Sequence, residues 1–597
     1  MAAADFDFAS LLEEATRAGE LRGSAAENIR ELLGASASTI YIAAVSELAR
    51  AGKWAELNDR FYRTLAFGTG GLRGRTIGKI VTKVEWGEAG ENERPQFPCV
   101  GTNAMNFFNV SRATQGLVAY LHEWRSQEKI EGKPKIVIAH DSRHFSKEFA
   151  ELAGKTAAEN GCDACVFEGP RSTPELSFAV RHLRASAGIV ITASHNPPRD
   201  NGYKLYSSDG SQIIPPNDEI VERFANVVTS PALGERTSAH HRWISPDLLD
   251  RYRSHMTQRF AVSHSDLAIT YTPLHGVGGA SMMDLFARAG YTNVTPVAAQ
   301  FEPDGAFPTL PFPNPEEPGA LDLAMARADE VQSTLVIAND PDADRLGAAV
   351  RDGAGWHVLR GDQIGWLLAS AMLPAMQDPR DVVATTIVSS TLLRAMARDA
   401  GVRFAMTLTG FKWLARAAGD GVLRLGYEEA LGFAVDPEVA DKDGLSAALA
   451  LSHLADDLRR HGQTLMDRLD EIEARFGVHS IFQLSLRAEG PSGLGAIIDA
   501  VQSLREDPPT TLGGLAVSAN FDLALGYEGL GPTDGVLLQL GESGRVVVRP
   551  SGTEPKLKAY IEITSPPSDA TSLAEQRRHG ELLVSAVRAD LESLLRL

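Results

Sequence analysis

One apolar pattern occurs three times in this chain and places its fold in the α/β class. Each copy is a short apolar run that ends in a polar loop: KIVIAHDSR (135–143), DLAITYTPLHG (266–276) and STLVIANDPDADR (333–345). These runs alternate with segments of helical period, which is typical of parallel sheets covered by helices. Because the first and third copies align closely, we expect repeated α/β domains rather than one large sheet. Ligands of such sheets bind beyond the carboxyl ends of the strands, where these polar loops fall.

The length of 597 residues is more than one hydrophobic core normally serves. At roughly 150 residues per domain, it predicts about four domains. After Gly477 the pattern changes to antiparallel strands, and the tail from Ser572 has the apolar spacing of a helix. We therefore predict three similar α/β domains with mixed or parallel sheets and a C-terminal α+β domain. The expected boundaries are 1–216 (with an N-terminal helical extension), 217–330, 331–465 (with the acidic loop) and 466–597.

The charge of the chain excludes several classes of partner. It has 58 basic and 77 acidic residues, for a net charge of −19. It therefore lacks the basic surface of a nucleic-acid-binding protein and is repelled by anionic membranes. An anionic substrate would need a locally basic site. The acidic N-terminus is unlike a signal peptide, and the longest apolar stretch, 364–376, is too short to span a membrane.

Three cysteines, Cys99, Cys162 and Cys165, are too few for a disulfide framework. This favours a reducing compartment, and we expect a cytoplasmic protein. Cys162 and Cys165 form a C-x-x-C pair, but two small apolar residues at the start of a strand are the simpler interpretation.

Three carboxylates follow the third apolar run. Asp340, Asp342 and Asp344 stand at i, i+2 and i+4, which would put them on one side of an extended backbone. Clustered carboxylates repel one another unless a cation holds them, and oxygen ligands suit Mg²⁺ or Ca²⁺. An EF-hand is excluded because the Gly and Glu of its loop are missing. A solvated acidic turn is the alternative to a metal site.

A second polar loop, TASHNPP (192–198), follows the strand-like residues 187–191. A serine in a tight loop at the end of a strand, with His195 beside it, is a candidate nucleophile or phosphate carrier. The G-x-S-x-G pattern is absent, which weakens an α/β-hydrolase interpretation of Ser194. A structured turn is the alternative.

Three further segments are weak when taken singly. GTGGLRG (68–74) is glycine-rich but has neither the P-loop pattern nor the dinucleotide spacing. RPSGTEPKLK (549–558) places hydroxyls, backbone N–H groups, one Arg and two Lys in a turn, which suits a phosphate but also fits a basic surface turn. GYEEALGF (426–433) holds the adjacent carboxylates Glu428 and Glu429, which can bind sugar hydroxyls or form a solvated pair.

Together and in this order, the motifs resemble those of the α-D-phosphohexomutase superfamily. TASHNPPRDNGYKLY (192–206) resembles its phosphoserine loop, DPDADR (340–345) its Mg²⁺ loop, GYEEALGF its sugar-selecting loop and RPSGTEPKLKAY (549–560) its phosphate-binding loop. The resemblance covers about residues 67–560. It implies four domains around a central cleft, with one loop from each. GTGGLRG and LTGFKWL are most similar to the phosphoglucomutase-2 and phosphopentomutase branch. Ala430 stands where many members have a serine that touches the sugar.

The resemblance implies a role for each matching residue. Ser194 would carry a phosphoryl group and, with Asp340, Asp342 and Asp344, hold one Mg²⁺. The other catalytic residues would be Lys204, which resembles the acid/base lysine of the family, and His195, Arg73 and Lys412. The substrate would be bound by Arg345, Glu428, Glu429, Arg549, Ser551, Gly552, Thr553 and Lys558. A sugar 1,6-bisphosphate would be the intermediate and activator.

The resemblance thus implies an isomerase, an intramolecular phosphotransferase that interconverts glucose 1-phosphate and glucose 6-phosphate. Phosphopentomutase and phosphomannomutase activities stay open, because composition and spacing do not separate the sugars. A metal-dependent sugar phosphatase is the alternative of another class. A non-catalytic sugar-phosphate sensor would not need both Ser194 and a metal triad. The expected partners are small sugar phosphates, without nucleic acid or membrane, and the oligomeric state stays open.

Overall fold

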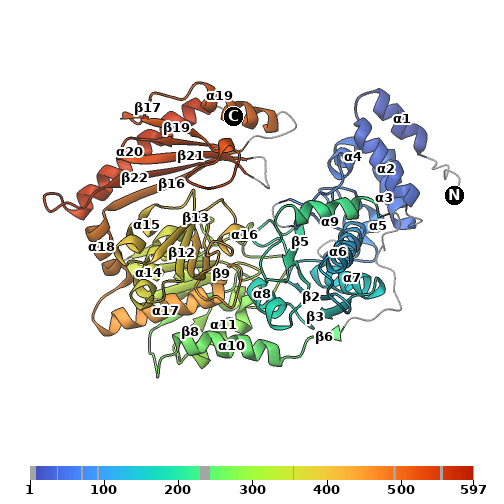
Figure 1. Cartoon of the computed structure of the whole chain (residues 1–597). Helices are drawn as coiled ribbons and strands as arrows, with labels where there is room; N and C mark the ends of the chain where they lie inside the picture. The colour runs from blue at the N-terminus through green and yellow to red at the C-terminus, as the bar shows by residue number, and fades with distance from the viewer. Residues whose placement is uncertain are drawn as a thin grey trace.

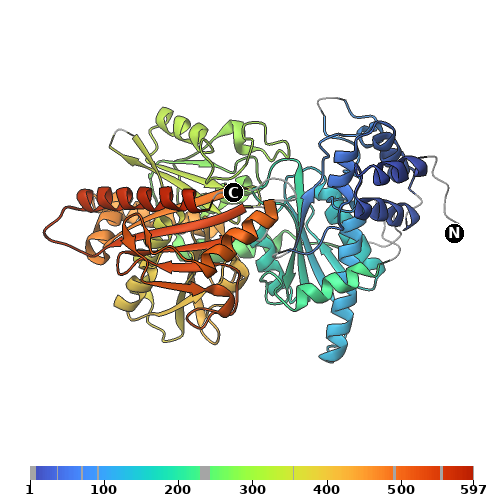
Figure 2. The ribbon, with the colours of Figure 1, turned by 90° about the horizontal axis from the view of Figure 1, so that it is seen from above.

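A computed structural model of the chain describes residues 8–35, 38–68, 71–90, 93–228, 242–353, 355–487, 493–551 and 556–595. A group of helices at the N-terminus is followed by three α/β sheets and a C-terminal antiparallel sheet (Figures 1 and 2). In both views the N-terminal helices lie on one side of the molecule and the C-terminal sheet on the other. The arrangement confirms the predicted fold class.

The N-terminal segment forms a small helical unit with a core of its own. Its helices are α1 (Ala9–Arg17), α2 (Gly23–Ala35), α3 (Thr39–Arg50) and α4 (Trp54–Phe61). Apolar side chains from all of them meet in one cluster, in which Leu12, Ile29, Val45 and Leu57 are buried. The expected helical extension is therefore present.

The described part of the polar segment 83–98 contacts this helical unit. Its short helix α5 (Lys83–Trp86) begins with a capping box formed by Thr82 and Glu85. The Glu85 carboxylate is buried and lies 2.6 Å from the guanidinium of Arg60 on α4. An ion pair shielded from water on both sides holds its partners firmly, because separating them leaves an unpaired buried charge.

The first α/β domain has a mixed six-stranded sheet in the order β1-β5-β4-β2-β3-β6. Its strands are β1 (Gly71–Arg75), β2 (Lys135–His140), β3 (Asp163–Val166), β4 (Ala187–Ile191), β5 (Asp200–Ser207) and β6 (Arg242–Trp243). Its helices are α6 (Phe107–Gln127), α7 (Ser146–Glu159), α8 (Thr173–His182) and α9 (Asn217–Asn226). Strand β5 runs antiparallel to both of its neighbours, β4 and β1.

Helix α9 belongs to this first domain, although the boundary expected at residue 216 falls before it. Val221 of α9 is buried in the core of the first sheet. The helix packs so closely on α6 that a Cβ added at Gly116 would lie 2.7 Å from the backbone of Val221 and of Ala225. The IIPP pattern before α9 marks a turn within the domain rather than its end.

The second domain has a five-stranded sheet in the order β11-β10-β9-β7-β8. Its strands are β7 (Ile269–Thr272), β8 (Val294–Pro296), β9 (Leu335–Asn339), β10 (Leu346–Asp352) and β11 (Gly355–Val358). Its helices are α10 (Asp247–Phe260), α11 (Gly278–Arg288), α12 (Ala298–Phe301) and α13 (Asp322–Glu330).

Two of the three repeated apolar runs therefore lie in one sheet. Strands β7 and β9 are parallel neighbours, with Ile269 opposite Leu335. The boundary expected at residue 330 would divide this sheet, and the acidic loop after β9 belongs to the second domain, not the third. The repeated sequence reflects a repeated strand-and-loop unit, and parallel neighbours in one sheet share such units as readily as separate domains do.

The third domain has a four-stranded sheet in the order β13-β12-β14-β15. Its strands are β12 (Asp381–Thr386), β13 (Arg403–Thr407), β14 (Val422–Glu428) and β15 (Gly432–Ala434). Its helices are α14 (Gly361–Met372), η1 (Leu373–Ala375), α15 (Leu392–Asp399), α16 (Phe411–Leu414), α17 (Gly444–Arg460) and α18 (Leu465–Phe476). Leu469 of α18 is buried in one hydrophobic cluster with Leu425 of β14, so this domain continues past the boundary expected at residue 465.

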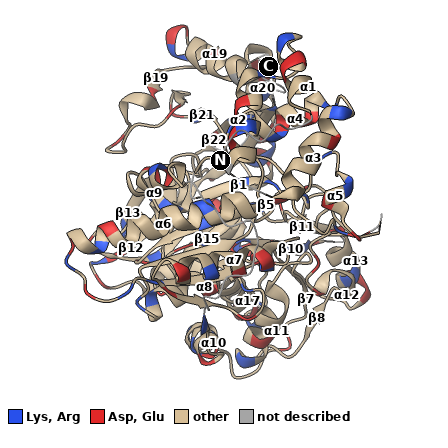
Figure 3. Cartoon of the chain, turned by 90° about the vertical axis from the view of Figure 1, so that its right-hand side faces the viewer, with Lys and Arg blue, Asp and Glu red and all other residues tan. Residues whose placement is uncertain are grey.

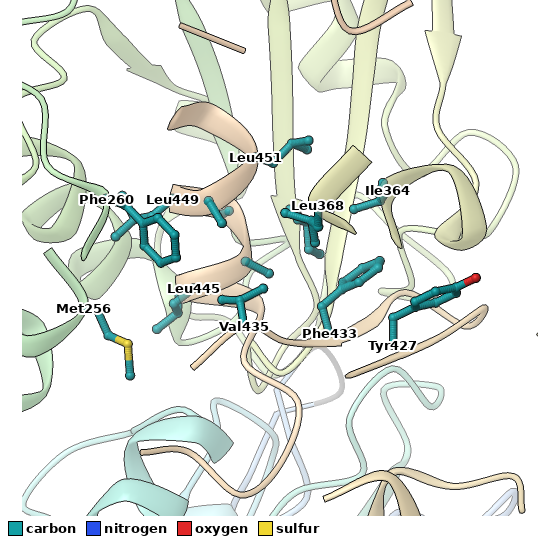
Figure 4. Close-up of a cluster of buried hydrophobic side chains, with 14 of the residues drawn as sticks. Met256, Phe260, Ile364, Leu368, Tyr427, Phe433, Val435, Leu445, Leu449 and Leu451 are labelled. Carbon is teal, nitrogen blue, oxygen red and sulfur yellow. The ribbon is translucent and has the colours of Figure 1, made fainter. Parts of the chain in front are cut away.

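The second and third domains share a continuous core. Figure 4 shows Met256 and Phe260 of α10 beside Leu445 and Leu449 of α17, and the cluster extends to Tyr427 at the end of β14. Burial of large apolar side chains stabilises such an interface by roughly 1.5–3 kcal/mol per side chain. The acidic loop (340–345) and the sugar-loop candidate (GYEEALGF, 426–433) are therefore supported by the same hydrophobic core.

The fourth domain is an antiparallel sheet in the order β16-β22-β21-β20-β19 with helices on it. Its strands are β16 (Val478–Arg487), β17 (Thr511–Leu512), β18 (Leu515–Ala516), β19 (Ala519–Asp522), β20 (Val536–Gln539), β21 (Gly544–Pro550) and β22 (Lys556–Ser565). Its helices are α19 (Gly493–Glu506), η2 (Leu523–Leu525) and α20 (Leu573–Leu594). Of the expected apolar face of α20, Val587 and Leu591 are buried, whereas Leu594 is 47% exposed.

The remaining sequence expectations concern surface charge, membranes and thiols. Basic and acidic residues occur together on the outer helices (Figure 3). Among the described residues, no helix combines the length and apolarity of a membrane-spanning segment. Cys162 and Cys165 are buried free thiols at β3, and burial raises the pKa of Cys162 to about 12. A thiol with so high a pKa is a poor nucleophile, which favours the packing role over redox chemistry.

Candidate active site

The acidic loop curls instead of running straight. Ala343 has a φ of 53°, and its N–H donates to the Asp340 carbonyl at 2.8 Å. This turn brings one carboxylate oxygen of each of Asp340, Asp342 and Asp344 within 4.8 Å of the others. The expectation of an extended backbone was wrong, although the three side chains do converge. The loop geometry, not strand alternation, makes the cluster.

The buried charges of this triad need a cation. Burial, together with the neighbouring carboxylates of Asp344 and Asp342, raises the pKa of Asp340 far above its usual range. Burial also opposes ionisation of Asp344, but Lys204 and Lys442 outweigh it and lower the pKa of that carboxyl. The Oδ1 atoms of Asp342 and Asp344 are buried without a hydrogen-bond partner. Three converging carboxylates with two unpaired oxygens fit a hard divalent cation such as Mg²⁺.

Two lysines supply part of the positive charge. Lys204 of β5 places its Nζ 2.6 Å from Asp342 and 2.8 Å from Asp344. Lys442 lies 3.4 Å from Asp344 and 3.5 Å from Asp441. Both ammonium groups are buried, and their carboxylate neighbours raise both pKa values despite burial. Lys442 escaped the sequence analysis, although a lysine between two aspartates in DKDG (441–444) was a visible signal.

Ser194 reaches this triad from the first domain. It lies three residues after the end of β4, and its φ of 51° turns the chain sharply there. The Oγ donates to Asp340 Oδ2 at 2.7 Å and lies 3.2 Å from Nδ1 of His195. The loop TASHNPP thus meets DPDADR across a domain interface. Thr173, at the start of α8, also donates to Asp342 at 2.6 Å across this interface.

Arg143 holds the serine loop in its shape. Its guanidinium donates to the carbonyls of Ser194 and Asn196, both at 2.5 Å, and to that of Pro197 at 2.8 Å. Its Nε lies 3.3 Å from Asp141, and both side chains are fully buried. Sequence analysis missed this residue, although it ends the first apolar run, KIVIAHDSR.

His195 and Arg73 border the serine. Burial and the positive charges of Arg345 and Arg73 lower the pKa of His195 well below its usual value, so the ring is neutral near pH 7. Arg73 stands in the middle of β1, opposite Gly202 of β5. Strand β1 therefore brings the arginine of GTGGLRG to the side of the serine loop.

Of the two glutamates of GYEEALGF, Glu428 ends β14 and Glu429 begins the tight turn that leads to β15. Burial raises the pKa of Glu428 to about 7, helped by Glu429 and opposed by Lys442. The Glu429 carboxylate accepts hydrogen bonds from Ser389 at 2.8 Å and from Thr386 at 3.3 Å. This segment lies beside the end of the acidic loop, since Arg345 pairs with Gly432 through an isolated backbone bridge.

Arg345 lies between the loops. Its Nη1 donates to Glu316 at 3.1 Å, and its Nε lies 4.0 Å from Asp340. The Nε atom is buried without a hydrogen-bond partner. Negative neighbours raise the pKa of this guanidinium despite burial. A charged donor with an unpaired N–H suits an anionic ligand.

The predicted phosphate loop stands at the turn between β21 and β22. Arg549 is paired with Lys558 across these strands, and the Ser551 N–H donates to the Lys556 carbonyl at 2.8 Å. Burial raises the pKa of Glu316, and Lys558 lies close enough to this carboxyl to oppose the rise. The predicted ligands Gly552 and Thr553 lie outside the described residues.

Lys412 takes a different place. It lies on α16 with its Nζ 5.4 Å from the centroid of the Trp413 ring. Burial lowers its pKa, and the charge that opposes this shift is that of Asp218 on α9. The described contacts of Lys412 therefore lie at the border between the third domain and α9, not at the acidic triad.

Comparison with known families matches the four sheet domains. Family models of phosphoglucomutase/phosphomannomutase match in order: alpha/beta/alpha domain I at 99–230, domain II at 250–353, domain III at 360–476 and the C-terminal domain at 496–579. These limits place α9 in the first domain and the acidic loop in the second, in agreement with the packing.

Curated relatives carry three different substrate names. The chain is 37% identical to a probable phosphomannomutase of Haemophilus influenzae, over 77% of this chain and 93% of the relative. It is 33% identical to a probable phosphoribomutase of Schizosaccharomyces pombe (87% and 90% covered). It is 32% identical to a phosphoglucomutase of Staphylococcus aureus (86% and 92% covered). Similarity therefore identifies the class of enzyme but not which sugar phosphate is the substrate.

Solved structures agree with the fold. A putative phosphomannomutase from Thermus thermophilus superimposes with a TM-score of 0.65 at 22% identity, covering 89% of this chain and 99% of that one. The open form of parafusin from Paramecium gives a TM-score of 0.64 at 17% identity, covering 89% and 96%.

Proposed function

The chain belongs to the phosphoglucomutase/phosphomannomutase family of the α-D-phosphohexomutases, and from this premise we propose that it interconverts glucose 1-phosphate and glucose 6-phosphate. Members of this family are isomerases that transfer a phosphoryl group within the substrate. One observation carries the proposal for the chemical centre: the Ser194 hydroxyl lies 2.7 Å from Asp340, in a buried carboxylate triad built across two domains.

Ser194 is the proposed phosphoryl carrier. Its Oγ stands at the end of β4, and its backbone is held by Arg143, so the oxygen has a fixed position. Asp340, Asp342, Asp344 and the serine oxygen would hold Mg²⁺, which when bound would draw charge from the transferring phosphoryl group. Phosphoryl transfer depends mainly on position and electrostatics, which a rigid loop of this kind provides.

The reaction moves two phosphates in turn. The phosphoryl group of Ser194 passes to the free hydroxyl of a sugar phosphate, which yields a sugar 1,6-bisphosphate. The bisphosphate turns over in the site, and its other phosphate returns to Ser194, which leaves the isomeric sugar phosphate. Lys204 is protonated at rest, because Asp342 and Asp344 raise its pKa. We therefore assign it as the general acid for the serine oxygen when this oxygen leaves.

The other charged residues bind the substrate. Glu428 and Glu429 would accept hydrogen bonds from ring hydroxyls in either orientation of the sugar. Arg549, Ser551 and Lys558 would hold the phosphate that does not react, together with Gly552 and Thr553 of the same motif. Arg345 and Arg73 would balance the negative charge, and neutral His195 would border the serine oxygen. Lys412 would act from the third domain, where it lies near Asp218 of α9.

A direct test replaces the serine. Ser194→Ala should lose nearly all mutase activity while it keeps the fold, because the carrier oxygen is gone. Intact-mass measurement should find a phosphorylated fraction in the wild type and none in the variant.

The wild type should be assayed on glucose, mannose and ribose 1-phosphates with a catalytic amount of glucose 1,6-bisphosphate. Turnover of Ser194→Ala at the wild-type rate would contradict the role, and release of inorganic phosphate as main product would indicate a phosphatase.

Phosphopentomutase activity is the second candidate, and Ala430 is the observation that favours it. A site that lacks one hydrogen-bonding group for the sugar discriminates less between sugars. The relative from Schizosaccharomyces pombe is named a probable phosphoribomutase. A kcat/KM that strongly favours ribose 1-phosphate over glucose 1-phosphate would decide for this candidate.

A further inference from the structure

The turn between β12 and α15, residues 387–391, is held by the fourth domain on one side and by the sugar-loop candidate on the other. We propose that this turn, with Ser389 at its centre, couples docking of the C-terminal domain to the placement of the Glu429 carboxylate. Ser389 is then a positioning residue. The inference rests on the proposed function, in which Glu429 binds a sugar hydroxyl.

On the sugar side, one hydroxyl serves Glu429 twice. The Ser389 Oγ donates to Glu429 Oε2 at 2.8 Å and accepts from the Glu429 N–H at 3.3 Å. Thr386 adds a longer contact to the same carboxylate oxygen, at 3.3 Å. Because both the backbone and the carboxylate of Glu429 depend on Ser389, a shift of the turn shifts the carboxylate.

On the side of the fourth domain, a buried ion pair contacts the backbone of the same turn. Arg545 of β21 donates through Nη2 to the Ser389 carbonyl at 2.6 Å. Its Nε lies 3.0 Å from Glu562 of β22, which also accepts from the Ser390 hydroxyl and the Thr391 N–H, both at 2.8 Å. Ser389 therefore contacts the fourth domain through its carbonyl and Glu429 through its hydroxyl.

Apolar contacts join the same surfaces. Ile387 and Val388 are buried in one cluster with Leu537, Val547 and Tyr560 of the fourth-domain sheet. Tyr560 is also close enough to Glu429 for that carboxylate to raise the pKa of its hydroxyl, although burial is the larger cause. Polar and apolar contacts thus hold the turn against the sheet over its whole length.

Buried charges stabilise the contact between the turn 387–391 and the fourth domain. Burial opposes ionisation of Glu562, but Arg545 and His479 outweigh it and lower the pKa of the carboxyl. Separating a buried ion pair leaves an unpaired charge, which costs far more than a surface pair does. On the third-domain side, the Ser390 N–H donates to Asp362 at 2.8 Å. The turn is therefore a junction that transmits the position of one domain to the other.

The test compares two ways of weakening the junction. Ser389→Ala removes the hydroxyl. Arg545→Lys keeps a positive charge beside Glu562 but cannot also reach the Ser389 carbonyl. Each should lower kcat/KM for glucose 1-phosphate by roughly tenfold, mainly through KM, since a hydrogen bond to a charged group is lost. The slow release of phosphate from phosphorylated Ser194 to water should not change, and Ser389→Thr should restore most of the activity. Ser370→Ala, on α14, is the matched control.

A double-mutant cycle gives the decisive result. If Ser389 and Arg545 act through Glu429, their substitution should have little further effect in a Glu429→Gln background. Effects that multiply in that background, or variants as active as the wild type, would overturn the coupling while leaving the proposed function in place. A wild type inactive on every sugar phosphate would overturn the proposed function and this inference with it.

Discussion

Arg143→Lys is the substitution that most directly tests how the serine loop is held. In the wild type, the fork of Arg143 reaches the carbonyls of Ser194, Asn196, Pro197 and Asp200, at 2.5 to 3.1 Å. A lysine keeps the charge opposite Asp141 but has a single donor centre. It therefore loses at least two of the four carbonyl contacts.

The expected size of the effect follows from these contacts. Each hydrogen bond to a charged group contributes about 1.5–3 kcal/mol, so losing two costs about 3–6 kcal/mol. The left-handed backbone at Ser194, with its φ of 51°, adds strain of about 1–2 kcal/mol that the fork offsets in the wild type. Because the loop relaxes, we take the lower end, about 3 kcal/mol, which corresponds to a loss of about two orders of magnitude in kcat/KM.

The assay is the mutase reaction with glucose 1-phosphate, together with the phosphorylated fraction of Ser194 by intact mass. Arg125→Lys is the matched control, since Arg125 lies on α6 of the same domain and donates to Gly132 and Ser186 away from the loop. The unfolding midpoint of Arg143→Lys should fall by several degrees, because the lost hydrogen bonds also stabilise the fold, so activity is compared well below that midpoint. Arg143→Lys enzyme with wild-type kcat/KM would refute the view that the guanidinium holds the loop.

Three further predictions concern the metal, the sugar and pH. Exhaustive chelation should abolish activity and Mg²⁺ should restore it, whereas Asp342→Asn should stay impaired at saturating Mg²⁺; full activity of this variant in chelator would exclude the site. Ala430→Ser should raise the ratio of kcat/KM for glucose 1-phosphate to that for ribose 1-phosphate by up to about tenfold, because one neutral hydrogen bond contributes that much. An unchanged ratio would show that residue 430 does not contribute to sugar specificity. Burial raises the pKa of Asp362 to about 7. The protonated carboxyl therefore contributes fully to the free energy of unfolding below about pH 4, and this contribution is lost as the pH rises through 7 and the buried group ionises. Asp362→Asn should therefore raise the unfolding midpoint above the wild type near pH 8 but not near pH 4, and a constant difference across this range would contradict the shift.

The chemical centre was largely predictable from sequence because its residues are adjacent in the chain. DPDADR and TASHNPP each hold several functional groups in one loop, and each follows an apolar strand. The sequence therefore predicted their place at the ends of strands. That the two loops meet, with Ser194 on Asp340, depends on how the first and second sheets dock, which no local pattern records.

The domain boundaries were harder to predict for a physical reason. Strands β7 and β9 carry the same kind of apolar run as β2, and an apolar run does not reveal whether its strand joins a neighbour or starts a new sheet. Helix α9 follows a proline pair that is typical of a linker, yet Val221 packs into the first core. The supporting residues Arg143 and Lys442 were missed because the contacts that tie them to the candidate site, with Ser194 and Asp344, are far away in the sequence.

Strand β1 connects the N-terminal helices to the candidate site. The match to the domain I family model begins at residue 99, but β1 (Gly71–Arg75) pairs with β5, where Gly71 stands opposite Lys204. A chain shortened to begin at residue 99 would leave β5 as an open sheet edge, with unpaired backbone groups beside Lys204. Helix α4 secures β1 through the ion pair of Asp59 and Arg75. The segment before residue 99 thus completes the edge of the sheet that carries Lys204.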